Sequence, residues 1–301
     1  MPSGLYLLLL DLSDMVHAVT PSSARIRSLL FCPANDERKL TKALDAGATL
    51  AVADLEDAIA PSEKERARKD LRRVVGEDPR TPNGLAIRVN DLAGPDAAAD
   101  LELVRELGPA AVVVPKAAAA TLAAAAPGLP PIVAIVETPA GLQECAAIAR
   151  VSGVKALLLG GVDLALALRL GGRADGLDLL FARSRLVVDS AAAGIDPPLD
   201  GVFTAVGDLD GLRAEAELVR SLGFGGKACI HPAHLETIHE AFSPGEAEAT
   251  WARRVVEAFD GAAAEGSGAI SVDGEMVDLP VAERARAILA ELAETTVGGA
   301  R

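Results

Sequence analysis

The chain has 301 residues and carries 29 Lys and Arg against 43 Asp and Glu, a formal net charge of −14. Such an acidic surface repels phosphate backbones and anionic lipid, so we expect neither nucleic acid nor a membrane surface as a partner. Half of the residues are hydrophobic and only 3% are aromatic, so Ala, Val, Leu and Ile must build the core. The length suits about two average domains or one large α/β barrel.

Cysteine usage and hydropathy favour a cytoplasmic protein. Cys32, Cys145 and Cys229 stand far apart without a C-x-x-C pair, which fits neither a disulfide framework nor a zinc site and indicates a reducing compartment. The apolar leader Leu5–Leu10 stops at Asp11 with no basic residue before it, so we expect no signal peptide. No uninterrupted apolar run approaches the roughly 18 to 20 residues of a membrane-spanning helix.

Residues 1–24 show no clear period and are expected to form an N-terminal extension. From Arg25 onward, short apolar runs alternate with amphipathic helical stretches. We expect strands at Ile26–Phe31, Leu50–Ala53, Leu85–Val89, Ala111–Val114, Ile132–Val136, Lys155–Leu159, Asp200–Phe203 and Gly226–Ile230. The helical patterns between them are Glu37–Ala46, Ser62–Val75, Ala97–Leu107, Gly141–Ala149, Leu177–Ala193 and Asp208–Leu222.

The order of these elements predicts an α/β protein, a (β/α)8 TIM barrel over residues 25–245. Eight strands that are mostly continuous apolar runs indicate a parallel sheet buried on both faces. One β-α unit recurs about every 28 residues, which is typical of this barrel. The main alternative is a doubly wound open sheet, which normally has a glycine-rich phosphate loop where this chain has Cys32-Pro33-Ala34-Asn35.

The pattern changes after the predicted barrel. A helix is expected around Ala247–Phe259, followed by a Gly-rich stretch and a short strand pair about Asp273-Gly274. A closing helix is expected from Val281. We therefore expect residues 246–301 to form a helical and hairpin cap.

The carboxyl ends of the strands form the active-site rim of a TIM barrel. Ionisable groups end six of the eight predicted strands, namely Asp54, Glu56 and Asp57 together, Arg88, Lys116, Glu137, Asp163 and His231. Every strand must end in something polar, but a ring that combines two acids, an arginine and a histidine is better explained by a site.

Glu137 and Asp163 end adjacent strands, so their carboxylates can converge on one small volume. Two carboxylates in a low-dielectric mouth repel each other unless a proton or a cation lies between them. Oxygen ligands completed by water suit Mg²⁺, which accepts one or two carboxylates and keeps several waters. The alternative is that the two acids cap the helices that follow them.

Three further strand-end residues each allow two interpretations. Arg88 could bind the carboxylate of an anionic substrate through its rigid guanidinium, or it could form a salt bridge with Glu56 or Asp57. His231 could be a base or a substrate donor, or a structural histidine. Lys116 could form a Schiff base if it is desolvated, or it could be a solvated lysine.

Eight sequence strings in a fixed order resemble the citrate lyase β-subunit-like proteins of the HpcH/HpaI aldolase and citrate lyase family. The resemblance covers about residues 25–293. The strings are Arg27–Asn35 (RSLLFCPAN), Asp54–Asp57 (DLED), Arg88–Asn90 (RVN), Val136–Thr138 (VET), Gly160–Leu164 (GGVDL), Ala182–Arg185 (ARSR), Gly226–Pro232 (GKACIHP) and Val272–Pro280 (VDGEMVDLP).

This resemblance implies a Mg²⁺-dependent carbon–carbon lyase on a barrel, a homotrimer acting on acyl-CoA thioesters of hydroxy acids. It implies cleavage of a substrate such as (S)-citramalyl-CoA or L-malyl-CoA to acetyl-CoA and a small 2-oxo acid. Glu137 and Asp163 would then be the metal ligands, with Glu137 also touching substrate. Arg88 would hold substrate and neutralise developing charge.

The resemblance also assigns residues to coenzyme A and to proton transfer. Phe31, Arg38, Lys42, Ile230 and His231 fall where relatives contact the CoA portion or the substrate. Separately, Asp278 matches a catalytic acid that the tail of a neighbouring subunit brings over the barrel mouth. Arg38 and Lys42 are also four residues apart on one predicted helical face, where two cations can meet phosphates.

The sequence departs from the family pattern at two places and leaves other functions open. Val162 stands where the residue before the metal-binding Asp is often Glu, and Ala34 replaces a common Gly in the first loop, which could alter the approach to CoA. The alternatives are a citryl thioester lyase, a CoA-independent 4-hydroxy-2-oxo acid aldolase and a non-catalytic CoA-binding regulator. Arg38, Lys42 and Asp278 argue against the aldolase, and the intact set of candidate catalytic residues argues against the regulator.

Overall fold

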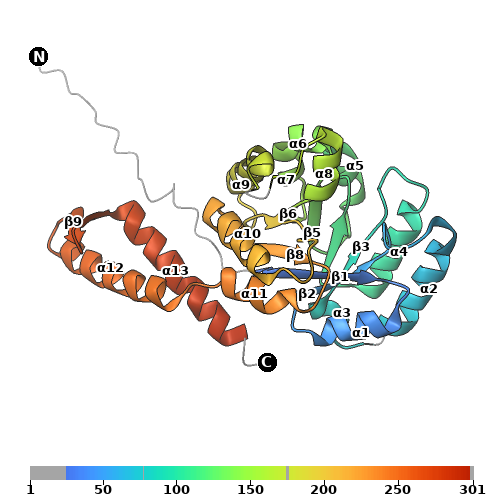
Figure 1. Ribbon diagram of the computed structural model, residues 1–301, viewed down its shortest axis with the longest axis horizontal. Helices are drawn as coiled ribbons and strands as arrows, with labels where there is room; N and C mark the ends of the chain where they lie inside the picture. The colour runs from blue at the N-terminus through green and yellow to red at the C-terminus, as the bar shows by residue number, and fades with distance from the viewer. Residues whose placement is uncertain (1–24, 77, 174–175, 299–301) are drawn as a thin grey trace, which may run out of the picture.

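The computed structural model describes residues 25–76, 78–173 and 176–298, so the expected extension at residues 1–24 lies outside the described part. Eight parallel strands close into a barrel in chain order, with β8 paired to β1 (Figure 1). The strands are β1 Ser28–Pro33, β2 Leu50–Asp54, β3 Leu85–Arg88, β4 Ala111–Val114, β5 Ile132–Val136, β6 Val154–Leu159, β7 Leu199–Asp200 and β8 Gly226–Cys229. The predicted TIM barrel is confirmed, and closure excludes the doubly wound open sheet.

Helices follow the strands and cover the outside of the barrel (Figure 1). In the first half they are α1 Glu37–Asp45, η2 Pro61–Glu63, α2 Lys64–Val75, α3 Thr81–Gly84, α4 Ala97–Leu107 and α5 Ala119–Ala125. In the second half they are α6 Pro139–Gln143, α7 Cys145–Ala149, α8 Gly161–Leu168, η3 Leu177–Leu179, α9 Leu180–Ala193, α10 Leu209–Leu222 and α11 His234–Ala241.

Both faces of the strands are buried, which explains why the strand sequences are continuously apolar. Val52, Val113 and Val133 belong to the cluster that fills the barrel interior. Ile87 and Val112 belong to the outer cluster that packs against the helices. Each of these side chains stabilises the fold by about 1.5–3 kcal/mol when it is fully buried.

Several predicted elements differ from the structure. The predicted helices Ser62–Val75 and Leu177–Ala193 each begin with a short 3₁₀ helix, η2 and η3. The seventh strand is only Leu199–Asp200 instead of Asp200–Phe203, because the chain leaves the barrel at Gly201. A Cβ at Gly201 would lie 2.7 Å from the Leu159 carbonyl oxygen, so the backbone there passes close to β6. The predicted helix Gly141–Ala149 is divided into α6 and α7 at Glu144, whose φ of −88° and ψ of 5° are not helical.

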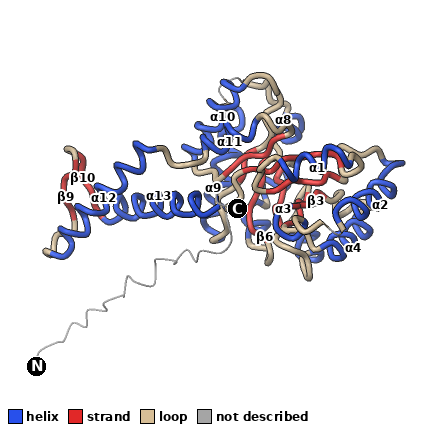
Figure 2. Tube along the Cα trace, turned by 90° about the horizontal axis from the view of Figure 1, so that it is seen from below, coloured by secondary structure: helices blue, strands red, loops and turns tan. Residues whose placement is uncertain are grey.

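A tail follows the barrel and consists of α12 Glu246–Ala264, β9 Ala269–Val272, β10 Glu275–Asp278 and α13 Leu279–Gly298. The expected hairpin about Asp273-Gly274 is present, with both residues at positive φ. The tail projects away from the barrel in both views (Figures 1 and 2). It has its own hydrophobic cluster, and Arg220 of α10 pairs with Glu248 of α12 at 2.8 Å. Within the described ranges, no helix is long and apolar enough to cross a membrane.

Candidate active site

A cavity of about 490 Å³ opens at the carboxyl ends of the barrel strands. Its ionisable lining residues are Asp54, Asp57, Arg88, Glu137 and Asp163. Its apolar lining includes Phe31, Ile135, Leu158, Val202, Ala228 and Ile230. The cavity thus combines an apolar enclosure with a few convergent charged groups, which is the composition of a small-molecule site.

Arg88 is held by the end of the neighbouring strand. Arg88 and Asp54 are register partners in the β2–β3 pairing. The Arg88 Nε donates to Asp54 Oδ1 at 2.7 Å, and its Nη2 donates to Asp54 Oδ2 at 2.6 Å. Its Nη1 lies 3.1 Å from Glu56 Oε2 and 3.3 Å from Asp57 Oδ2. The predicted salt bridge to Glu56 and Asp57 is therefore confirmed. Arg88 also lines the cavity, where binding of a substrate carboxylate stays a prediction.

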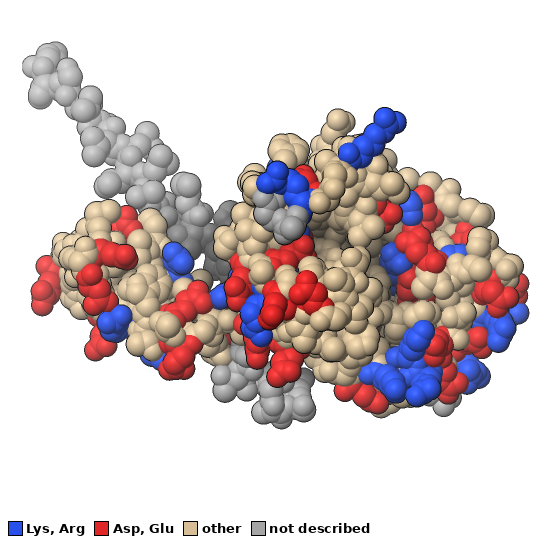
Figure 3. Space-filling model, in the orientation of Figure 1, with Lys and Arg blue, Asp and Glu red and all other residues tan. Residues whose placement is uncertain are grey.

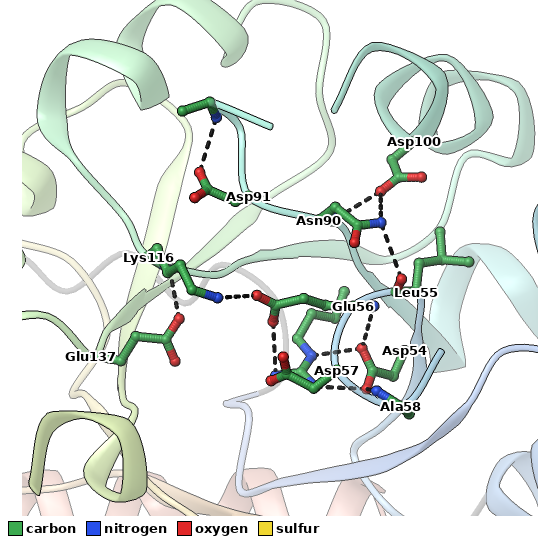
Figure 4. Close-up of polar contacts among 12 residues, drawn as sticks. Asp54, Leu55, Glu56, Asp57, Ala58, Asn90, Asp91, Asp100, Lys116 and Glu137 are labelled. Carbon is green, nitrogen blue, oxygen red and sulfur yellow. Dashed lines mark hydrogen bonds and ion pairs between the residues drawn. The ribbon is translucent and has the colours of Figure 1, made fainter. Parts of the chain in front are cut away.

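Lys116 forms an ion pair with Glu56 (Figure 4). Burial by itself would lower the pKa of Lys116, but the hydrogen bond and charge of Glu56 outweigh it and raise the pKa above its ordinary value. A Schiff-base lysine needs a lowered pKa, so this environment does not suit that chemistry. The side chain of Lys116 is 41% exposed, as expected for a solvated lysine, but the buried carboxylate of Glu56 holds its ammonium group.

Glu137 is only 4% exposed and follows β5, while Asp163 lies in the first turn of α8 and is exposed. Burial, together with the charges of Glu56 and Asp163, raises the pKa of Glu137 to about 7, although the backbone N–H of Lys116 opposes this by donating to it at 2.7 Å. The helix-capping alternative is wrong for Glu137, because Thr138 is the residue that caps α6.

The donor set at the mouth fits Mg²⁺. The mouth contains five carboxylates, from Glu56 and the four acids of the cavity lining. Only two cations, Arg88 and Lys116, stand against them. In the described part of the chain, no group of three or more His, Cys, Asp or Glu residues could hold a metal ion. Glu137 and Asp163 could supply two carboxylates to such an ion, and water or substrate would complete its shell, as Mg²⁺ prefers.

The remaining candidates at the mouth lie on β1, α1 and the end of β8. Phe31 and Ile230 line the cavity, and the guanidinium of Arg88 lies 5.3 Å from the centre of the Phe31 ring. Arg38 and Lys42 are exposed on α1, over which basic side chains gather in Figure 3. His231 is exposed beside the cavity, and its Nδ1 accepts a hydrogen bond from the Ala233 amide at 3.2 Å.

Asp278 does not lie at the mouth of its own barrel. It is the last residue of β10, and its Oδ1 accepts a hydrogen bond from the Val281 amide at 3.3 Å. The hairpin lies at the far end of the tail in both views (Figures 1 and 2). Within one chain, therefore, Asp278 is separate from Arg88 and Glu137.

The structure also adds residues to the site. Sequence reasoning missed the Glu56–Lys116 pair and the role of Asp54 as the anchor of Arg88. The strand-end string Asp54–Asp57 was the available signal, but it could not say which acid pairs with which base. Ala34, which replaces a common Gly in the first loop, is only 1% exposed and belongs to the core cluster outside the strands.

Comparisons with known proteins show the family of the chain. Residues 27–232 match the family model described as HpcH/HpaI aldolase/citrate lyase. The chain is 36% identical over 267 residues to a (3S)-malyl-CoA thioesterase of Cereibacter sphaeroides, covering 88% of this chain and 92% of the relative. It is 37% identical over 280 residues to the citrate lyase subunit beta-like protein of Deinococcus radiodurans, covering 88% and 97% of the two chains.

A solved structure shares the fold as well as the sequence. It is the protein CitE of Mycobacterium tuberculosis in complex with magnesium, acetoacetate and coenzyme A. The match has a TM-score of 0.79 and 32% identity, and it covers 89% of this chain and 98% of CitE. A closed barrel with four carboxylates and an arginine around one cavity defines a cation-assisted TIM-barrel enzyme. The chain belongs to the HpcH/HpaI aldolase/citrate lyase family.

The close approach of Gly160 to Glu137 gives a first prediction. A Cβ at Gly160 would lie 2.3 Å from the Glu137 Cβ and 2.7 Å from its Oε2, so Gly160→Ala must displace the carboxylate. We expect a folded variant whose Mg²⁺ affinity, measured by calorimetry, falls about tenfold or more. Gly245→Ala is the control, because a Cβ there meets nothing within 4 Å. Equal affinities of the two variants would contradict this packing constraint.

A second prediction concerns pH and the stability of the metal-free protein. The pKa of Glu137 is about 7 in the folded chain and 4.5 ordinarily, so the folded state binds the proton more tightly. Stability should therefore fall as pH rises from about 5 to 8, by up to about 3 kcal/mol. Urea unfolding in EDTA should detect this loss in the wild type and a smaller one in Glu137→Gln. The same pH dependence in both proteins would show that Glu137 does not ionise as described.

Proposed function

We propose that this chain is a cytoplasmic, Mg²⁺-dependent carbon–carbon lyase that cleaves or forms a β-hydroxyacyl-CoA. The expected substrates are (S)-citramalyl-CoA or L-malyl-CoA, giving acetyl-CoA with pyruvate or glyoxylate. The observation that carries the proposal is the charge of the cavity, whose described lining includes four carboxylates and one guanidinium. A substrate carboxylate would be repelled from such a cavity unless a cation accompanied it.

Glu137 and Asp163 would hold the ion. When bound, Mg²⁺ supplies a Lewis acid for the carboxylate and hydroxyl oxygens of the substrate. Support comes from the related CitE structure, which contains magnesium together with acetoacetate and coenzyme A. The apolar part of the lining, including Ile135 and Leu158, would exclude water from the reacting carbon atoms.

Arg88 would neutralise the negative charge that develops on the substrate oxygen as the hydroxyl becomes a carbonyl. Its guanidinium is fixed by Asp54 and packs over Phe31, so little reorganisation is needed when that charge appears. Because Asp54 occupies the bidentate edge, substrate would meet the guanidinium on its Nη1 side, where it would compete with Glu56 and Asp57. Ile230 and His231 would contact substrate at the opposite rim.

The CoA portion would lie along α1. Arg38 and Lys42 are exposed there and form no ion pair with other described residues, so both can meet phosphate oxygens. Phe31 lines the cavity from β1, the strand that precedes this helix, and would lie beside the thioester. These three positions favour a CoA thioester over a free 4-hydroxy-2-oxo acid.

Asp278 of a neighbouring subunit would transfer the proton at the acetyl carbon. Asp278 cannot serve its own barrel from the end of a tail that projects away from it (Figure 1). A homotrimer would bring each tail over the next barrel mouth. In the lyase direction Asp278 would protonate the acetyl-CoA enolate, and in condensation it would remove the methyl proton.

A second candidate function is hydrolysis of the thioester. It is favoured by the 36% identity to a relative named (3S)-malyl-CoA thioesterase. Products separate the two functions, because a lyase releases acetyl-CoA and glyoxylate from malyl-CoA, whereas a thioesterase releases free CoA and malate. A screen of malyl-CoA, citramalyl-CoA and citryl thioesters with a thiol assay and an oxo-acid assay decides between them.

A third prediction tests the metal and Arg88 together. EDTA should abolish release of acetyl-CoA and Mg²⁺ should restore it, while Glu137→Ala and Asp163→Ala should fold without turnover.

Arg88→Lys should lower kcat and raise KM, because an ammonium group cannot bind Asp54 bidentately and still present fixed N–H groups to substrate. Steady-state kinetics check both effects. Trapping of a Lys116 adduct by borohydride would contradict the metal mechanism, and wild-type kinetics for Arg88→Lys would make Arg88 structural.

A fourth prediction concerns the shared site. Asp278→Asn should fold, assemble and bind CoA but lose activity by about a hundredfold or more, since the amide cannot transfer the proton. Mixing it with an inactive Arg88→Ala variant should partly restore turnover, because mixed oligomers contain some mouths with both residues intact. Absence of recovery despite proven subunit exchange would overturn the shared site and leave Asp278 acting within its own chain or not at all. A purely local role would instead cost about 1 kcal/mol of stability with chemistry intact.

A further inference from the structure

The backbone of Lys116 has an unusual conformation. Lys116 follows β4 and has a φ of +47°, one of three non-glycine residues with positive φ in the described part of the chain. This left-handed region is unfavourable for a residue with a Cβ and persists only where surrounding contacts enforce it. Something in the fold must therefore hold Lys116 there.

In this conformation the backbone amide of Lys116 contacts Glu137, a candidate metal ligand. The Lys116 amide donates to Glu137 Oε1 at 2.7 Å, and the next amide, of Ala117, donates to the Ile135 carbonyl on the neighbouring strand at 3.1 Å. Glu137 is also confined on its other side by Gly160. The amide of Lys116 thus fixes the orientation in which Glu137 faces the cavity.

The side chain of Lys116 is tethered at its far end. Its ammonium group pairs with Glu56 Oε1, and Glu56 is only 6% exposed (Figure 4). Glu56 is itself immobilised, because its amide donates to Asp54 Oδ1 at 2.8 Å and its carbonyl accepts from Lys64 Nζ at 2.6 Å. The tether of Lys116 therefore ends on a rigid loop.

The carboxylate of Glu56 also forms an ion pair with Arg88, the proposed substrate-binding arginine. Glu56 Oε2 lies 3.1 Å from Arg88 Nη1, while Oε1 binds Lys116. One buried side chain thus connects Arg88, at the end of β3, with the residue that orients Glu137, at the end of β5. Neither Glu56 nor Lys116 belongs to the cavity lining, so both act through other residues.

We propose that Glu56 and Lys116 are positioning residues: their ion pair holds the Lys116 backbone in the left-handed conformation that orients Glu137, and it fixes Arg88 relative to the metal ligands. This inference rests on the proposed function, because it assigns Glu137 to Mg²⁺ and Arg88 to substrate. Residues around a metal ligand commonly set its geometry in this way.

Two substitutions at one position separate the backbone contact from the side chain. Lys116→Ala and Lys116→Gly both remove the ion pair, but only glycine adopts a φ of +47° without strain. In Lys116→Ala the amide should leave Glu137, and Mg²⁺ affinity should fall about tenfold to a hundredfold. In Lys116→Gly the amide can stay in place, so Mg²⁺ affinity should lie close to that of the wild type.

The measurement is calorimetric titration of the full-length protein with Mg²⁺ in the absence of substrate. Circular dichroism and thermal unfolding of each variant establish that it is folded. Equal Mg²⁺ affinities for Lys116→Ala and Lys116→Gly would overturn the inference. A wild type that binds Mg²⁺ with the expected order of variants but cleaves no acyl-CoA would refute the proposed function alone. A wild type that binds no Mg²⁺ would refute both.

A second arm tests Glu56 and does not depend on Lys116→Ala being folded. Glu56→Gln should weaken Mg²⁺ binding in the wild-type background, because the tether of Lys116 loses its charge. The same change in the Lys116→Gly background should have no further effect, since glycine needs no tether. Equal losses in the two backgrounds would overturn the inference. Glu56→Gln should also raise KM through Arg88, an effect that Lys116→Gly should not share.

Discussion

Negative charge gathered in a low-dielectric mouth is the constraint on which the whole site depends. Glu137 is buried near Glu56 and Asp163, and burial with these charges raises the pKa of Glu137 to about 7. Arg88 and Lys116 neutralise the acids that follow β2. No cationic side chain of the described residues forms an ion pair with Glu137 or Asp163, so that half of the mouth favours a proton or a metal ion.

The other half of the mouth is made rigid by buried polar residues. Lys64 donates to the carbonyl groups of Leu55 and Glu56 at 2.7 and 2.6 Å. Asn90 donates to the Leu55 carbonyl at 3.0 Å and to Asp100 at 2.7 Å. These bonds fix the loop after β2 before any substrate arrives. Its carboxylates therefore hold Arg88 in place without a cost of reorganisation during the reaction.

The strands and most of the candidate site could be predicted from the sequence because they depend on local patterns. A continuous apolar run gives Ile132–Val136 directly, and the strand-end rule then places Glu137 at the mouth. The predicted strand Asp200–Phe203 was wrong because the chain packs closely against β6 at Gly201 and the strand ends there. A pattern of apolar residues contains no information about such a contact. The role of Lys116 was missed for a similar reason, since a positive φ enforced by a distant carboxylate is a tertiary property.

The tail carries Asp278 away from the mouth of its own barrel. Its hydrophobic cluster, which includes Val277, is separate from the two barrel clusters, so barrel closure does not need it. Met276 and Leu279 flank Asp278 with exposures of 71% and 53%, which is costly for apolar side chains in water. The barrel mouth likewise exposes apolar groups such as Val162, at 56%. Contact between one chain's hairpin and another chain's mouth would cover both surfaces and add the carboxylate of Asp278 to the cavity.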